Sequence, residues 1–228
     1  MQLVKYLQAQ GIGSRRQCQI LADSGLVVVN GETVSDAKAE IVPETVRSLD
    51  IGGKPVCVIP LPCFYILLNK PAGYETSHKP RDWPSVFTLF PGNLRNADMQ
   101  AVGRLDADTT GVLLITNDGQ FNHRMTSPKH HVAKLYRATL KHAADAAFCE
   151  RLESGVLLHD DNETVAADAA ELSDPHTLLL TIGEGKYHQV KRMVAAAGNR
   201  VEKLHRLRFG AWSAEDLPVG GWRFVSIG

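Results

Sequence analysis

The chain has 228 residues, of which 44% are hydrophobic and 22% charged, and its 25 Lys and Arg balance its 25 Asp and Glu. This length is large for one compact domain and suits a small domain followed by a larger one. No apolar run approaches the roughly 18 residues that a membrane-spanning helix needs, and the first residues lack the layout of a signal peptide. We therefore expect a cytoplasmic protein that does not enter a membrane.

The zero net charge is the sum of basic and acidic segments. Residues 121–141 hold five Lys and Arg and no acid, and residues 184–208 hold seven Lys and Arg against two Glu. Residues 142–176, between them, hold nine Asp and Glu and one Arg. Such segments can be plain solvated faces, but a basic segment is also where a polyanion such as RNA binds.

The first sixty residues have the pattern of a small unit. A short helix is expected around Leu3–Leu7, and Ser14 suits the N-cap of a second helix that ends near Asp23. Gly25 can supply the left-handed turn after that helix. A β-branched strand over 26–30 then runs into Asn-Gly, a strong hairpin signal, and Gly-Gly at 52–53 marks a second tight turn.

The rest of the chain alternates strands and helices after a stiff linker, Pro-Leu-Pro-Cys, at residues 60–63. We therefore divide the chain into a domain of residues 1–59, the linker 60–63 and a domain of residues 64–228. The larger domain is expected to be α+β, with a mixed, mainly antiparallel sheet flanked by helices. The predicted strands cover residues 64–69, 111–116, 134–140, 177–182 and 222–227, and the predicted helices cover residues 118–125, 144–154 and 188–197.

The four cysteines are not arranged as metal ligands or as a disulfide framework. None is part of a Cys-x-x-Cys pair, and the histidines near them lack metal-ligand spacing. We expect free thiols, as in a reducing compartment, at Cys18, Cys57, Cys63 and Cys149.

The strongest chemical signal lies between Gly103 and Gly119, where Asp106 occupies a glycine-bounded loop that leads into a hydrophobic strand. Such a loop can hold a carboxylate rigidly at a sheet edge. Arg104 is two residues away, close enough to help keep that carboxylate ionised. A lone Asp before Thr-Thr-Gly is usually a turn or cap residue, so this loop alone leaves the role of Asp106 open.

The small unit resembles an S4 RNA-binding domain. The resemblance is carried by Gly-Ser-Arg-Arg at 13–16 followed by Gly-Leu-Val-Val-Val-Asn-Gly at 25–31. It implies that Arg15 and Arg16, at the start of the second helix, contact RNA. Cations there oppose the helix dipole, which favours an anionic partner. Lys5 is a further candidate, although Val4 stands where the family usually has Asp.

Five motifs in order make the rest of the chain similar to pseudouridine synthases of the RsuA family, which act on ribosomal RNA. The central one is Gly-Arg-Leu-Asp-Ala-Asp-Thr-Thr-Gly at 103–111, followed by Leu-Leu-Ile-Thr-Asn-Asp-Gly at 113–119. The others are Leu-Asn-Lys-Pro-Ala-Gly at 68–73, the segment 126–136 with Lys-Leu-Tyr at its end, Glu-Gly-Lys-Tyr-His-Gln-Val-Lys-Arg-Met at 184–193, and 198–206. With the S4 unit, the resemblance covers nearly the whole chain.

The resemblance implies a role for each of four residues. Asp106 is the catalytic carboxylate, acting as nucleophile toward C6 or C1′ or as a base on the ribose; the sequence does not choose among these. Tyr136 stacks on the everted base, and Lys191 pairs with Asp106. Arg104 holds the everted nucleotide's backbone or fills the vacated stack. Isomerisation involves no net redox change or hydrolysis, so no cofactor and no metal are expected. We expect His188 to have a structural role or to face the RNA.

The expected partner is ribosomal RNA, bound by a monomer. The segments around 126–131 and 187–192 most resemble the small-subunit enzyme of the family, which implies uridine 516 of 16S rRNA as target, presented on a partly assembled particle. RNA contacts are expected from basic side chains on both units: Lys5, Arg15, Arg16, Lys129, Lys134, Arg137, Lys186, Arg192 and Arg206.

Three alternatives are weighed against this function. Large-subunit RNA could be the target, since related enzymes share the same framework. Asp106-Ala-Asp-Thr-Thr110 also fits the nucleophile motif of haloacid-dehalogenase-like phosphotransferases, with Asp160 and Asp161 as an acidic metal pair. That family needs a strand directly before the first Asp, and Val-Gly-Arg-Leu is a poor strand end. A non-catalytic RNA-binding assembly factor would explain the basic segments but not Asp106, Tyr136 and Lys191 together.

Overall fold

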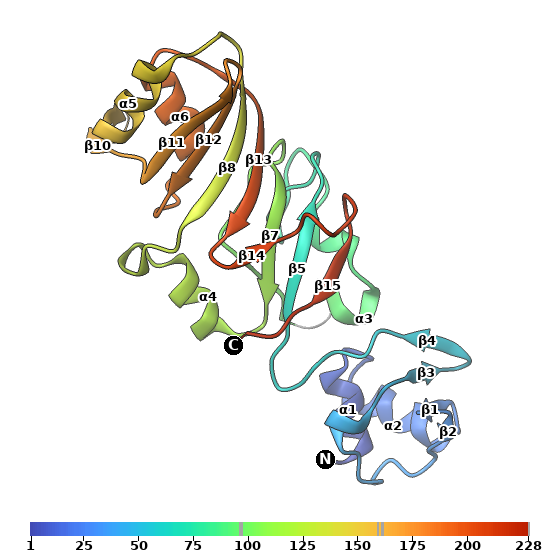
Figure 1. Ribbon diagram of the computed structural model, residues 1–228. Helices are drawn as coiled ribbons and strands as arrows, with labels where there is room; N and C mark the ends of the chain where they lie inside the picture. The colour runs from blue at the N-terminus through green and yellow to red at the C-terminus, as the bar shows by residue number, and fades with distance from the viewer. Residues whose placement is uncertain (96–97, 159, 161, 228) are drawn as a thin grey trace.

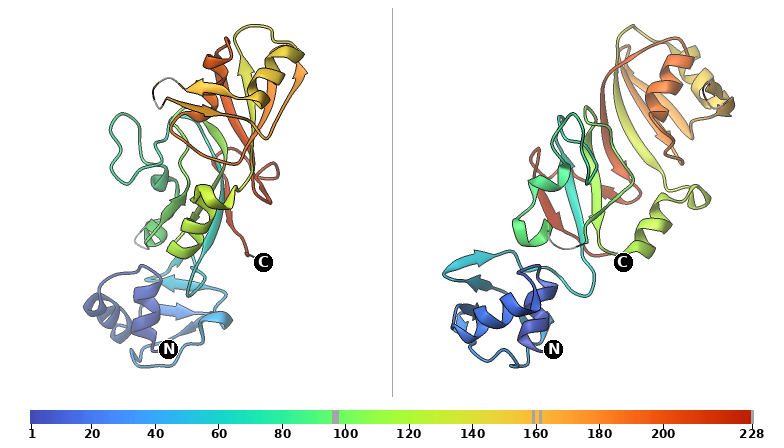
Figure 2. Two further views of the ribbon diagram at one scale, coloured as in Figure 1. Left: turned by 90° about the vertical axis from the view of Figure 1, so that its left-hand side faces the viewer. Right: turned by 180° about the vertical axis from the view of Figure 1, so that it is seen from behind.

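A computed structural model describes residues 1–95, 98–158, 160 and 162–227. It shows two units at opposite ends of an elongated molecule, with the small N-terminal unit at one end and helices α5 and α6 at the other (Figures 1 and 2). Within the described ranges, no helix is long and apolar enough to cross a membrane.

The small unit packs two helices on a four-stranded antiparallel sheet of order β2-β1-β3-β4. Its core joins apolar residues of both helices to β1 and β3. In chain order its elements are α1 Leu3–Ala9, α2 Arg15–Asp23, β1 Val27–Val29, β2 Glu32–Thr33, the 3-10 turn η1 Pro43–Thr45, β3 Leu49–Ile51 and β4 Lys54–Val56.

The local signals of the small unit are confirmed. The Ser14 hydroxyl accepts from the Gln17 amide while the Gln17 side chain accepts from the Ser14 amide, a full capping box. Gly25 has a φ of +65° and ends α2. Asn30 and Gly31 have φ values of +51° and +87°, which is the geometry that a two-residue hairpin requires.

The larger unit is α+β, as expected, and its main sheet has nine strands. The order is β11-β12-β8-β13-β7-β5-β15, with β14 paired to β13 and β6 to β7. Among the described strand pairings of this sheet, only β13–β7 is parallel, so the sheet is mixed and mainly antiparallel. The main strands are β5 Tyr65–Lys70, β6 Gln100–Val102, β7 Thr110–Thr116, β8 Lys134–Leu140, β11 Ala169–Asp174, β12 Thr177–Ile182, β13 Val201–Phe209, β14 Trp212–Ser213 and β15 Trp222–Phe224.

Helices cover parts of this sheet, α5 lying against β11 and α6 against β13. A separate two-stranded sheet pairs β9 with β10. The remaining elements are η2 Val86–Leu89, α3 Gly92–Arg95, α4 Gly119–Thr126, η3 Pro128–His130, α5 Ala146–Ser154, β9 Val156–Leu158, β10 Glu163–Val165 and α6 Gln189–Ala196. The predicted helix over 144–154 begins at Ala146, because the Asp145 side chain caps it by accepting from the Phe148 amide.

The sheet is joined across its middle by a very close approach of β7 and β13. Gly111 has a φ of +100°, and a Cβ at this position would lie 2.2 Å from the Arg206 carbonyl oxygen. Glycine is therefore required for the parallel pairing of Gly111 with Arg206. This pairing places the loop before β7 next to the half of the sheet that carries β8 and α6.

The two units have separate hydrophobic cores and polar contacts at their junction. The Gln10 side chain donates to the Ile59 carbonyl at 2.8 Å and accepts from its amide at 2.6 Å. Asn93 of α3 donates to the carbonyls of Gln10 and Cys57 at 3.1 and 2.8 Å. The division at residues 60–63 stays a prediction, since Ile59 packs in the core of the larger unit and Leu61 against that of the small one. All four cysteines are free thiols, as expected.

Candidate active site

The loop between β6 and β7, residues 103–109, is held by hydrogen bonds to the segment that follows β5. Gly73 donates its amide to the Ala107 carbonyl at 2.7 Å. The Thr76 hydroxyl donates to the Leu105 carbonyl at 2.8 Å and accepts from the Leu105 amide at 3.3 Å. Leu105 is buried. These contacts fix the backbone on both sides of Asp106, so its carboxylate has a defined position.

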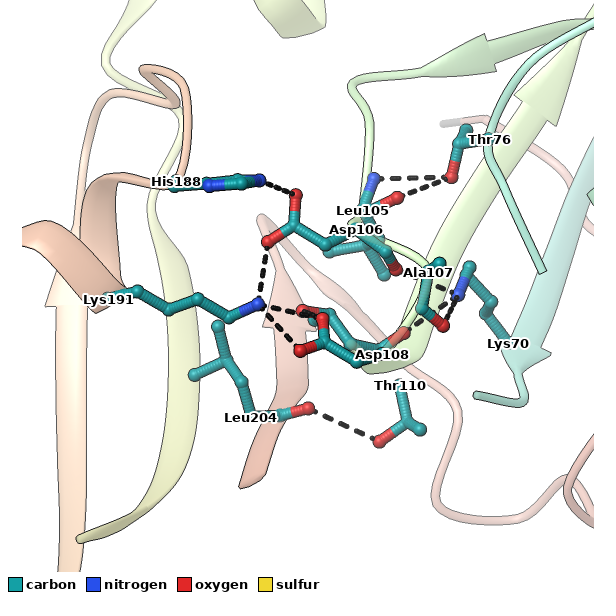
Figure 3. A network of polar contacts seen from close by, with 11 residues as sticks. Lys70, Thr76, Leu105, Asp106, Ala107, Asp108, Thr110, His188, Lys191 and Leu204 are labelled. Carbon is teal, nitrogen blue, oxygen red and sulfur yellow. Dashed lines mark hydrogen bonds and ion pairs between the residues drawn. The ribbon is translucent and has the colours of Figure 1, made fainter. Parts of the chain in front are cut away.

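Lys70 organises the same loop from inside the protein. Its side chain is fully buried, and its Nζ donates to the carbonyls of Asp106 at 3.0 Å, Ala107 at 3.3 Å and Thr109 at 2.8 Å, as well as that of Pro71 at 3.0 Å. Burial lowers the pKa of Lys70 to about 8, although the carboxylates of Asp108 and Asp106 oppose this. Figure 3 shows Lys70 on the opposite side of the loop from the Asp106 carboxylate.

Substitution of Lys70 by methionine is expected to lower the free energy of unfolding by about 2–5 kcal/mol, because buried carbonyls lose their donor. Urea denaturation measures this loss. Lys79→Met removes the same charge from an exposed side chain of a nearby loop and is expected to cost less than about 0.5 kcal/mol. Equal stabilities of the two variants would mean that Lys70 does not hold the loop.

The Asp106 carboxylate faces two basic side chains at the start of α6. One oxygen lies 3.1 Å from Lys191 Nζ and the other 3.2 Å from His188 Nε2. The same Lys191 Nζ donates to both oxygens of Asp108, at 2.7 and 2.9 Å. Lys191 therefore lies between two carboxylates, as Figure 3 shows.

This arrangement keeps Lys191 charged. Burial opposes ionisation of Lys191, but the hydrogen bonds to Asp108 and Asp106 outweigh it and raise its pKa above the ordinary value. Partial burial likewise disfavours the Asp108 carboxylate, yet the hydrogen bond and charge of Lys191 hold the pKa of Asp108 below its usual range. An ammonium ion therefore lies against the Asp106 carboxylate at neutral pH.

A pocket opens beside Asp106 and is lined by residues of both halves of the sheet. Tyr136 on β8 is 7% exposed. Its hydroxyl lies 3.5 Å from Nη1 of Arg206, which also donates from Nε to the Val112 carbonyl at 2.8 Å. Apolar walls come from Leu105, Ile182 and Leu204. The pocket thus combines an aromatic ring, an apolar surface and the ion pair between Asp106 and Lys191.

The four residues expected to carry catalysis come together. Asp106, Tyr136, Lys191 and Arg104 all line this pocket, although they come from distant parts of the chain. The implied pairing of Lys191 with Asp106 is present. Arg104 does not have the electrostatic contact with Asp106 that was expected, because its side chain is exposed and no ion pair joins these two residues. Lys191 and His188 contact the Asp106 carboxylate instead.

The basic residues expected to bind RNA fall into three groups. Lys5, Arg15, Arg16, Lys129 and Arg137 are exposed. Two others are occupied by acids: Lys186 pairs with Glu163 and Glu184, and Arg192 with Asp160. Lys134 and Arg206 are 7% and 1% exposed and line the pocket beside Asp106, so the RNA contact expected of them would lie inside this pocket and stays a prediction.

Burial of Lys134 and Arg206 follows from the strands that carry them. Both side chains point to the core face of the sheet, where each lies against the Phe209 ring at 5.2 and 4.9 Å from its centroid. Lys134 Nζ donates to the carbonyls of Val132 and Gly183 at 2.7 and 3.1 Å. Burial, aided by the charge of Arg206, lowers the pKa of Lys134 to about 8.

Sequence reasoning missed three side chains of the site. His188 was expected to be structural or RNA-facing, but it contacts the Asp106 carboxylate. Its φ of +48° places it in the left-handed region immediately before α6, and no sequence pattern announces that conformation for a histidine. Asp108 and Lys70 were seen only as parts of motifs. Lysine within an apolar strand, as Lys70 is in β5, was the available signal.

The phosphotransferase alternative has no support in this geometry. Asp108 is bound to Lys191, and Asp160 pairs with Arg192, while Asp161 lies outside the described residues. Three residues separate the end of β6 from Asp106, where that family needs a strand directly before the nucleophile. The described part of the chain contains no group of three His, Cys, Asp or Glu that could hold a metal ion.

Comparison with known proteins agrees with the geometry. Residues 64–196 match the RNA pseudouridylate synthase family and residues 1–46 match the S4 domain. A Yersinia pestis protein named ribosomal small subunit pseudouridine synthase A is 38% identical over 98% of this chain and 94% of its own length. The Escherichia coli K12 protein of that name is 40% identical over 86% of this chain and 84% of its own. A crystal structure described as pseudouridylate synthase matches with a TM-score of 0.69 and 35% identity, covering 99% and 96% of the two chains.

Proposed function

This chain belongs to the RNA pseudouridylate synthase family, and we propose that it converts one uridine of small-subunit ribosomal RNA into pseudouridine, namely uridine 516 of 16S rRNA. The observation that carries the proposal is the Asp106 carboxylate, which lies at a pocket wall against Lys191 and His188. The similarity to two proteins named for the small subunit supports the choice of RNA.

The reaction breaks the bond between N1 of uracil and C1′ of ribose, turns the base, and joins C5 to C1′. The C5 proton leaves and N1 gains a proton, so atoms and electrons balance without an external reagent. Asp106 supplies the carboxylate that starts this sequence, as nucleophile or as base. Lys191 and the backbone contacts of the loop hold that carboxylate in place, which limits the reorganisation needed at the moment of reaction.

The pocket suits a single everted base. A uridine must leave its stack before its C1′ and C5 can reach a protein side chain. Tyr136 supplies a ring against which the base can stack, and its position is fixed by burial and by Arg206. Leu105 and Ile182 add apolar surface. We assign Arg104, exposed at the pocket rim, to the phosphate backbone of the everted nucleotide.

One everted base does not distinguish its uridine from others, so selectivity must come from the flanking RNA. Folded RNA is recognised through shape, phosphates and unpaired segments. Arg15 and Arg16 are exposed in the first turn of α2, and no ion pair within the described residues involves either. The two arginines are available to phosphate on the small unit, while Lys129 and Arg137 are exposed on the larger one.

Replacing Arg15 and Arg16 together by alanine is expected to weaken RNA binding and to flatten its salt dependence. Each lost phosphate contact removes roughly one unit from the slope of log affinity against log salt concentration. Turnover at saturating RNA is expected to stay nearly unchanged, because the carboxylate lies in the other unit. Fluorescence anisotropy across a salt series and single-turnover kinetics measure the two quantities.

The matched control for this variant is Lys38→Ala with Lys54→Ala, which removes two exposed cations from the same unit. We expect its salt dependence to stay close to that of the wild type. A loss of turnover with unchanged binding in the arginine variant would show that these residues serve something other than RNA binding.

The target RNA is tested by offering the purified protein four substrates in parallel: free small-subunit RNA, a protein-bound precursor particle, large-subunit RNA and tRNA. We expect modification of one uridine in the small-subunit samples, with the precursor particle as the better substrate. Efficient single-site modification of large-subunit RNA or tRNA alone would refute the target and keep the reaction. Binding without modification of any of the four would favour an assembly factor. We further propose that the protein works as a monomer in the cytoplasm.

A further inference from the structure

Tyr187 is an exposed aromatic side chain that lies in the chain between Lys186 and His188, two residues that line the active-site pocket. It is 71% exposed, although an aromatic ring normally gains free energy from burial. Its ring stacks on that of His188, with centroids 3.8 Å apart and an angle of 20° between the planes. Its carbonyl accepts a hydrogen bond from Arg192 Nη1 at 3.2 Å. One face of the ring is therefore supported, and the ring is oriented rather than loose.

The supported ring is connected to the reacting carboxylate. His188, on which Tyr187 stacks, lies 3.2 Å from Asp106 through Nε2. Lys186 and His188, the neighbours of Tyr187, line the pocket beside Asp106, whereas Tyr187 does not. Tyr136 lines that pocket and is nearly buried. The chain thus presents two aromatic rings near Asp106, one inside the pocket and one outside it.

We propose that Tyr187, supported by His188, is a stacking site for a nucleobase next to the target uridine in the RNA. This site rests on the proposed function. The target base enters the pocket with Tyr136, and the adjoining nucleotide, still linked through its phosphate, remains at the entrance where Tyr187 lies.

Base flipping gives the physical reason for such a site. When a uridine leaves the stack, its neighbour loses a stacking partner, and this unstacking is part of the cost of flipping. An exposed aromatic ring at the entrance replaces the lost partner, since every nucleobase has a face that can stack. Stacking at Tyr187 also presses its ring against His188, and so keeps the imidazole at Asp106.

Neighbouring charges contribute little to the attraction of RNA to Tyr187. Lys186 forms ion pairs with Glu163 and Glu184, and Arg192 with Asp160, so the cations that flank Tyr187 along the chain are already partnered. Hydrogen bonds to Glu163 and Glu184 raise the pKa of Lys186 above its usual value, although burial opposes this. RNA binding at Tyr187 therefore depends on its ring more than on neighbouring charge.

Three substitutions of Tyr187 test the ring. Single-turnover kinetics on the RNA fragment that the wild-type protein modifies give a half-saturating protein concentration and a maximal rate. Tyr187→Ala and Tyr187→Leu are expected to raise the half-saturating concentration about tenfold, within the range of stacking on one base. Tyr187→Phe keeps the ring and is expected to match the wild type. The slope of affinity against salt is expected to stay unchanged in all three, unlike in the Arg15 and Arg16 variant.

The partner base is identified with RNA that lacks one base. Abasic nucleotides are placed directly before or directly after the target uridine. One of these two RNAs is expected to bind the wild type about tenfold more weakly than the intact RNA, and to bind Tyr187→Ala no more weakly than the intact RNA does. Fluorescence anisotropy measures binding directly, so stacking is tested apart from turnover.

Two results would overturn the stacking site. One is unchanged binding by Tyr187→Ala; the other is an abasic effect of the same size in wild type and variant at both positions. A reduced maximal rate with unaltered binding would mean that Tyr187 only orients His188. Failure of the wild type to modify any RNA would refute the proposed function instead, and is distinguishable because binding is measured separately.

Discussion

Replacement of Asp106 by asparagine is expected to reduce pseudouridine formation by at least about a thousandfold, in line with removal of a central catalytic group. The amide has the shape of the carboxylate but does not act as nucleophile or base. RNA binding is expected to stay within about twofold of the wild type, because binding is spread over surfaces of both units. Single-turnover kinetics and fluorescence anisotropy measure the two effects.

The control for Asp106→Asn is Glu150→Gln, which makes the same change of carboxylate to amide on the exposed face of α5. We expect wild-type activity from this control. Product formation by Asp106→Asn at even a tenth of the wild-type rate would contradict the catalytic role of the carboxylate.

Replacement of Lys191 by methionine is expected to lower the maximal rate by roughly a hundredfold, comparable to removal of one preorganised charged contact. Methionine keeps much of the side-chain volume, but Asp106 and Asp108 then face each other without the ammonium between them. Repulsion between like charges displaces or protonates one of them. Lys191→Arg keeps the charge and is expected to retain the larger part of the activity.

The control for Lys191→Met is Lys141→Met, which removes an exposed charge just beyond the end of β8. Its maximal rate is expected to equal that of the wild type. Thermal unfolding of each variant separates loss of rate from loss of structure. Equal maximal rates for Lys191→Met and the wild type would show that the ion pair has no part in the reaction.

Much of the fold was predictable because its signals are local. The capping residue Ser14, the Asn30-Gly31 turn and the apolar run of β7 each specify their element through a few neighbouring residues. β13 was not predicted as a strand. Its pairing with β8 shifts register between Val201 and Lys203 and again between Arg206 and Arg208, so its inward residues do not alternate regularly. β11 was missed because it lies at the sheet edge, where four of its six residues are exposed and no apolar run marks it.

The site was predictable to the extent that motifs carry it. The resemblance predicted that Asp106, Tyr136 and Lys191 act at one site, and all three line the same pocket. The position of His188 depends on a left-handed backbone and on a loop far away in sequence, which no local pattern reveals. The burial of Lys134 was predictable from the sequence, because the two-residue period of a strand that turns Tyr136 inward also turns Lys134 inward.

The most direct test of the central claim is pseudouridine mapping of total RNA from cells with the intact gene, without it, and with the Asp106→Asn variant as the only copy. We expect one small-subunit uridine to be modified only where the intact protein is present, with all other pseudouridines unchanged. An identical pseudouridine map in all three cell lines would contradict the account, as would restoration of the missing modification by Asp106→Asn.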